Sequence, residues 1–138
     1  QVDLKNPAQG SDFHGLEGEI ELARGNNSRA IELLLLADQE HASAITAESV
    51  AHAYLTAGNT DQAIAAYEKL VGNPRALGWE AQQQWIAAHY QLAKAYLSRG
   101  EKAKAAPLLH KLLDLWKDAD ADLPLLKEAR QLSAGLKN

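Results

Sequence analysis

The 138-residue chain contains no cysteine, a single phenylalanine and little valine or isoleucine. Without cysteine it can form neither a disulfide framework nor a thiolate metal site. The shortage of aromatic and β-branched residues argues against a β fold, and the abundant alanine, leucine, glutamine, glutamate and lysine favour helices. No apolar stretch approaches the roughly 20 residues that would span a membrane. The length suits one domain with a buried core.

The chain also lacks an excess of basic residues. Its net charge of −4 argues against a nucleic-acid-binding protein, which normally presents a basic face. The charge is uneven: residues 1–74 carry 11 acidic and 4 basic residues, a net −7, and residues 75–138 carry 7 acidic and 10 basic residues, a net +3. Solvated helix faces explain such a pattern, and so does a polar surface that orients a charged partner.

Motifs for catalysis and metal binding are missing as well. No nucleophile elbow, phosphate-binding loop or dinucleotide-binding glycine motif is present, and no two of the five histidines form an i, i+4 pair. Asp118, Asp120 and Asp122 have the spacing that opens a calcium loop, but Leu123 and Ala129 replace its glycine and its final carboxylate. We interpret these aspartates as a linker whose last member caps a final helix. The sequence predicts no enzyme, no metal and no cofactor.

One pattern occurs three times, around Gly25, Gly58 and Gly100. Each glycine follows a small residue by seven positions, and it precedes an alanine by five positions and a large apolar residue by nine. Such fixed small and large positions around a glycine turn are typical of stacked helical hairpins. The sequence therefore predicts an all-α, right-handed α-solenoid of three hairpins with a C-terminal capping helix.

The expected boundaries follow from this pattern. We expect a loop over residues 1–11, three hairpins within 12–118 (about 12–40, 42–72 and 80–117), and a linker with the capping helix over 119–138. Helicity should begin near Ser11 or Asp12, and Pro107 should bend its helix or move the helix start later. The apolar positions expected at helical spacing are Phe13, Leu16, Ile20 and Ala23 in the first helix, and Leu125, Leu126, Ala129 and Leu132 in the last.

These positions resemble the tetratricopeptide repeat. That family keeps a small residue and then an aromatic on the first helix, glycine at the turn, and alanine and a large apolar residue on the second. The second and third repeats match at Ala51, Tyr54, Gly58, Ala63 and Tyr67, and at Ala93, Tyr96, Gly100, Ala105 and Leu109. The first keeps Gly18, Gly25, Ala30 and Leu34, with Glu21 in place of the aromatic.

The C-terminal half carries a second, narrower resemblance. Segments 77–82, 88–92, 115–120 and 126–129 are similar to the C-terminal repeats of bacterial signalling proteins that also contain a Ser/Thr kinase or a winged-helix domain. With Gln1 rather than methionine at its start, the chain is expected to be a piece of a larger bacterial protein. A cytoplasmic location is favoured, and a secreted or periplasmic one would follow if Gln1 is a processed N-terminus.

The resemblance implies where a partner would bind. The first helix of each hairpin lines the concave side, where the outward positions include Asp12 and Glu19. The expected partner-binding residues are Glu48, Ser49, His52, Tyr90, Gln91 and Lys94. Chaperone-binding members clamp a peptide carboxylate with lysine and asparagine, and here those places hold Gly15, Glu19, Glu48, His52, Tyr90 and Lys94, which disfavours acidic chaperone tails.

The predicted function is therefore a non-catalytic module that binds a protein or peptide, and neither nucleic acid nor membrane. Two alternatives stay open. The repeats could be a structural module that self-associates or packs on its parent domain. They could also form a sensory domain that holds a small ligand in the concave groove.

Overall fold

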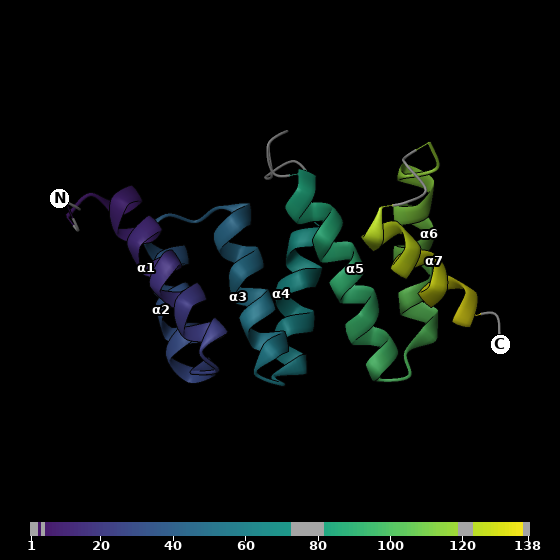
Figure 1. Ribbon diagram of the computed structural model, residues 1–138, viewed down its shortest axis with the longest axis horizontal. Coiled ribbons are helices and arrows are strands. Elements are labelled where there is room, and N and C mark those ends of the chain that lie inside the picture. The colour runs from purple at the N-terminus through teal and green to yellow at the C-terminus, as the bar shows by residue number, and fades with distance from the viewer. Residues whose placement is uncertain (1–2, 4, 73–81, 119–122, 137–138) are drawn as a thin grey trace. The chain divides into compact units, whose positions relative to one another are not determined.

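The computed structural model describes residues 3, 5–72, 82–118 and 123–136. Within these ranges it is entirely α-helical, and no strand occurs, which confirms the predicted all-α class. The helices are α1 (Pro7–Ala23), α2 (Asn27–Glu40), α3 (Ala44–Thr56), α4 (Thr60–Gly72), α5 (Gln82–Ser98), α6 (Lys102–Leu115) and α7 (Pro124–Gly135). Consecutive helices pair as the hairpins α1–α2, α3–α4 and α5–α6 (Figure 1). The chain divides into two compact units, residues 1–85 and 86–138.

The three hairpin turns share one geometry. Gly25, Gly58 and Gly100 have φ angles of +82°, +79° and +75°, a left-handed conformation that glycine adopts without steric cost. In each turn the amide of the residue after the glycine donates to a carbonyl five residues back, as in a Schellman motif. A Cβ on these glycines would meet no atom within 4 Å. The glycines are therefore required by backbone conformation and not by crowding.

The small and large positions of the repeat form the core of the hairpins. Ala30, Ala63 and Ala105 are fully buried, and so are the large residues four positions later. Gly18 lets α1 approach α2 closely, because a Cβ there would lie 2.6 Å from Cγ of Leu34. The first hairpin thus keeps the expected packing although its motif is degenerate.

The start of α1 differs from the expectation. The helix begins at Pro7 rather than near Ser11, because the Asn6 side chain accepts a hydrogen bond from the amide of Ala8 at 3.1 Å. Pro7 occupies the first helical turn, where its missing N–H costs nothing. A helix cap inside the expected loop therefore moves the boundary toward the N-terminus.

The prediction of the apolar face of α1 is also wrong, because its residues are exposed. Phe13, Leu16 and Ile20 are 37%, 64% and 41% exposed, and Ala23 is exposed too. The buried residues of α1 are instead Gly10, Ser11, Gly18 and Leu22. Small residues let α1 lie close to α2, and the Ser11 hydroxyl donates to the carbonyl of Ala37 at 2.9 Å. Close backbone packing and this hydrogen bond outweigh burial of the larger apolar stripe.

The start of α6 and the cap of α7 differ from the predictions, and α7 buries only part of its predicted apolar stripe. α6 begins at Lys102 and runs through the exposed Pro107, so the second of the two alternatives for Pro107, a later helix start, is wrong. α7 packs on α6 and buries Leu126, Ala129 and Ser133, whereas Leu125 and Leu132 are only partly buried. The N-cap of α7 is Leu123, without a side-chain hydrogen bond, so the expected aspartate cap is wrong. Residues 119–122 lie outside the described residues.

Candidate protein-binding groove

A groove of about 410 Å³ lies between α1 and α3, within the unit of residues 1–85. Its floor is formed by Leu34 and Ala37 of α2, each 1% exposed. We call it the α1–α3 groove and define it by its lining residues, Ser11, Asp12, Gly15, Leu16, Glu19, Leu34, Ala37, His41, Ser43, Ile45, Thr46 and Ser49. The close packing of α1 on α2 buries Ser11 and Gly18 at the contact and leaves Leu16 exposed on the groove side.

Two aliphatic side chains stand exposed in the groove. Leu16 of α1 is 64% exposed and Ile45 of α3 is 62% exposed. The start of α3 is held by a reciprocal cap between Ser43 and Thr46, and the Thr46 hydroxyl also donates to Asp38 of α2 at 2.6 Å. Ile45 therefore sits on a fixed first turn. Sequence reasoning placed Leu16 in the expected apolar stripe of its helix and did not single out this pair.

Carboxylates line and flank the same groove. Asp12 and Glu19 are exposed on α1. On α3, burial raises the pKa of the half-buried Glu48, and the charge of Glu19 raises it further, while His52 and the Tyr67 hydroxyl oppose the shift. Glu19 and His52 are therefore electrostatic neighbours of Glu48. Burial, followed by the charge of Glu48, raises the pKa of Tyr67 as well.

The expected binding residues of α5 lie in the other unit, residues 86–138. Tyr90 is only 5% exposed, and its hydroxyl donates to a carboxylate oxygen of Glu128 on α7. Burial, followed by this hydrogen bond, raises the pKa of Tyr90 to about 12. Gln91 is partly exposed, and the exposed Lys94 places Nζ 5.3 Å from the Tyr90 ring centroid.

The six expected residues therefore form two groups. Glu48, Ser49 and His52 share α3, each of them partly exposed, and Ser49 lines the α1–α3 groove. The other three share α5, where the tyrosine is buried and hydrogen-bonds to α7.

Comparison with protein families bears on two of the three hairpins. Two segments, residues 49–75 and 87–119, match family models of the tetratricopeptide repeat. These matches support the tetratricopeptide repeat family. They coincide with most of the α3–α4 and α5–α6 hairpins. No curated protein matches the chain. Tetratricopeptide repeats generally mediate protein–protein interactions and are typically non-catalytic.

The first hairpin departs from the repeat motif at Glu21. This residue stands where the tetratricopeptide motif has an aromatic, and it accepts hydrogen bonds from Arg24 at 2.7 Å and from the Asn26 side chain at 2.6 Å. The bond from Asn26, followed by that from Arg24, lowers the pKa of Glu21. Polar contacts around the turn thus replace aromatic packing.

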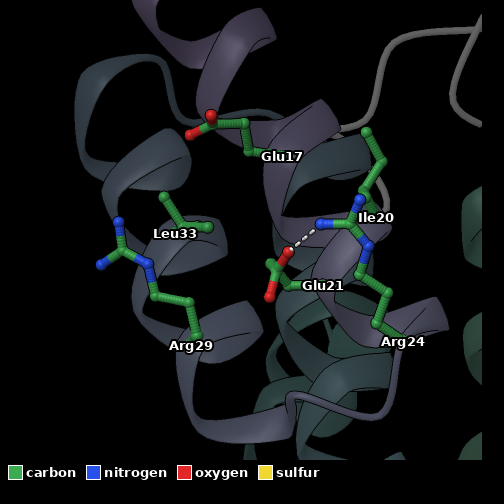
Figure 2. A pocket seen from close by; sticks show the side chains of 6 residues that line it. All are labelled: Glu17, Ile20, Glu21, Arg24, Arg29 and Leu33. Atoms are coloured by element: carbon green, nitrogen blue, oxygen red, sulfur yellow. Dashed lines mark hydrogen bonds and ion pairs between the residues drawn. The ribbon is translucent and has the colours of Figure 1, made fainter.

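Figure 2 shows the hollow of about 280 Å³ that surrounds this contact on the α1–α2 hairpin. Glu21 points toward Arg24 at the end of α1, with Arg29 on the α2 side. Arg29 is itself paired with Glu32 at 3.1 Å. Because the central carboxylate is already hydrogen-bonded, we assign this hollow a structural role in the turn.

The part of the chain that the structure describes presents neither a metal centre nor a membrane span. Its residues contain no group of three or more histidine, aspartate or glutamate side chains arranged to hold a metal ion. None of the helices described there has the length and apolar character needed to cross a membrane.

Proposed function

We propose that the chain is a protein-interaction module that holds a segment of a partner protein in the α1–α3 groove. The observation that carries this proposal is the pair of aliphatic side chains, Leu16 and Ile45, that line one hollow while more than half exposed. Exposed apolar side chains surrounded by polar ones are typical of docking surfaces. Fixed helix caps support the groove, so little entropy is lost when a partner binds.

The residues expected from sequence take different parts in this proposal. Ser49 contacts the partner inside the groove, and Glu48 and His52 extend the contact surface along α3. On α5, Lys94 and Gln91 offer a second polar surface. Tyr90 acts as a buried support whose ring underlies Lys94.

The parent protein is a second part of the proposal. The resemblance of the C-terminal segments to repeats of bacterial signalling proteins favours a larger signalling or regulatory protein as the source of this module. The adjoining domain would then set the pathway, and the repeats would supply the partner contact.

Affinity capture from cell extract tests the groove. The Leu16→Ser/Ile45→Ser double variant should lose partners that the wild-type chain recovers, because it removes both apolar anchors. Both positions are exposed, so each substitution should change the free energy of unfolding by about 0.5 kcal/mol or less. Leu115→Ser is the matched control, because Leu115 is 53% exposed on α6 and lies outside the groove lining.

The outcomes separate the alternatives. A folded double variant that recovers the same proteins with the same affinity would exclude the groove as the site. If wild-type chain sediments as a dimer and the double variant as a monomer, the exposed pair serves self-association instead. The proposal would also be contradicted if the wild-type chain captured no protein that the Leu16→Ser/Ile45→Ser variant does not capture.

A further inference from the structure

We propose that the segment bound in the α1–α3 groove is positively charged and amphipathic, with lysine or arginine flanking one or two large apolar residues. This inference rests on the proposed function of the groove and adds the chemistry of its partner. Three features of the unit of residues 1–85 lead to it: the charges in the groove lining, their lack of internal compensation, and the shape of the apolar floor.

The lining carries charge of one sign. Asp12 and Glu19 belong to it, whereas it contains no lysine or arginine. Glu48 adds a third carboxylate beside Glu19. The surrounding sequence has the same sign, since residues 1–85 contain 12 acidic and 5 basic residues, a net −7. A cationic segment would be attracted and oriented by this field, and an acidic one repelled.

These carboxylates are not neutralised within the described part of the chain. Neither Asp12 nor Glu19 forms an ion pair there. Other glutamates of the same hairpin are compensated: Glu21 pairs with Arg24 at 2.7 Å and Glu32 with Arg29 at 3.1 Å, and Glu40 lies 2.8 Å from His14. Of the α1 carboxylates without an ion pair, Asp12 and Glu19 line the groove, and Glu17 lines the hollow of Figure 2. The two groove carboxylates therefore have no cation among the described residues to compete with that of a partner.

Glu19 and Glu48 also oppose each other. The charge of Glu19 contributes to the raised pKa of Glu48, with burial as the larger cause. A cation placed beside both would relieve this repulsion. His52 already acts in that direction, because its charge lowers the pKa of Glu48.

The apolar part of the groove fits the same partner. Leu16 and Ile45 flank a floor of buried Leu34 and Ala37, and the volume of about 410 Å³ lies within the roughly 300–1,000 Å³ of typical ligand sites. A leucine or phenylalanine side chain can occupy that floor. The methylene stems of lysine or arginine can cover Leu16 and Ile45 while their charged ends reach the carboxylates.

Selection from a random displayed-peptide library tests the inference. Peptides are selected on the wild-type chain after depletion on the Leu16→Ser/Ile45→Ser variant, and their dissociation constants are measured at low and high salt. We expect enrichment of lysine and arginine next to leucine, isoleucine or phenylalanine, with weaker binding at high salt. Asp12→Asn/Glu19→Gln should weaken binding about tenfold. Glu17→Gln/Glu32→Gln, which also removes two carboxylates of this hairpin but none from the groove lining, should leave it unchanged.

Failure of the charge inference and failure of the groove give different results. Acidic or uncharged peptides that require Leu16 and Ile45 would overturn the charge inference and leave the groove as a binding site. Cationic peptides insensitive to Asp12→Asn/Glu19→Gln would also overturn it. If the selected peptides bind the wild type and the Leu16→Ser/Ile45→Ser variant equally, or if no peptide is enriched, both the groove and the charge inference are contradicted.

Discussion

α3 and α5 are the first helices of two successive repeats, yet the same position has a different environment in each. Counted back from the turn glycine, positions 10, 9 and 6 hold Glu48, Ser49 and His52 in α3, and Tyr90, Gln91 and Lys94 in α5. At position 10, Glu48 is half-buried and interacts electrostatically with Tyr67 of its own hairpin, whose buried hydroxyl makes no hydrogen bond within the described residues. Tyr90 is buried and donates to Glu128 of α7, a helix outside its hairpin.

Both helices thus place a tyrosine and a glutamate together, with the two residue types exchanged. In the first case the pair lies within one hairpin, and the polar face of α3 continues into an open groove. In the second case the pair joins α5 to α7, the helix that packs on α6. A position in the repeat therefore specifies the direction of a side chain, and the next helix decides whether that side chain is surface or core.

Tyr90→Ala should have the largest effect on stability. Removing a buried aromatic ring should lower the free energy of unfolding by about 3 kcal/mol or more, and Tyr90→Phe, which removes only the hydrogen bond to Glu128, by about 1 kcal/mol. Urea unfolding measures both. Gln91→Ala, at the partly exposed next position, is the control and should stay within about 0.5 kcal/mol. If Tyr90→Ala lowers the free energy of unfolding by less than about 1 kcal/mol, Tyr90 does not lie in a packed core beside α7.

Gly18→Leu should come next, because it attacks the packing that turns the apolar stripe of α1 outward. Its side chain would overlap Leu34, where a Cβ alone already lies 2.6 Å from Cγ. We expect a loss of about 1–3 kcal/mol in urea unfolding. Gly15→Ala is the matched control on the same helix, since its Cβ would meet Ala37 at an ordinary 3.9 Å. Equal stability of the two variants would contradict the close approach of α1 and α2.

The turns are the feature that the two units share, so valine at Gly25 and at Gly100 should have similar effects. A β-branched side chain at φ near +80° should cost about 1–2 kcal/mol in each case. Thermal or urea unfolding checks this. Gly135→Ala, where no positive φ is present, should cause no loss. A cost at one turn only would show that the turns are not equivalent.

Glu48→Gln should have the smallest effect, and its sign should depend on pH. Because burial raises the pKa of Glu48, the folded state favours the protonated form. The stabilisation from this carboxyl is present below its ordinary pKa of 4.5 and is lost as the pH rises through the folded-state pKa. Glu48→Gln should thus be slightly more stable than the wild type at pH 7. That difference should vanish near pH 4 in urea unfolding. A variant less stable at pH 7 would show that the ionised carboxylate is favourable.

The sequence predicted what depends on local conformation and on residue size. The three glycine turns, the hairpins and the buried alanines could be recognised because a positive φ and a close helix contact each restrict the residue types allowed. For the candidate site, the polar positions Asp12, Glu19 and Ser49 were expected to face outward, and the groove lining contains all three. Leu16 and Ile45 could not be placed there, because helical spacing alone does not distinguish a core stripe from an exposed one.

By itself, then, the sequence determined the all-helical hairpins and the side of each helix that bears the repeat positions. Tertiary structure decided which of those sides are covered. Ser11 hydrogen-bonds a carbonyl 26 residues away, and Tyr90 a carboxylate 38 residues away. Exposure depends on neighbours at such separations, whereas the repeat motif read along the chain spans a separation of 16 residues within a single hairpin. For that reason the turns of this protein were predictable and its groove was not.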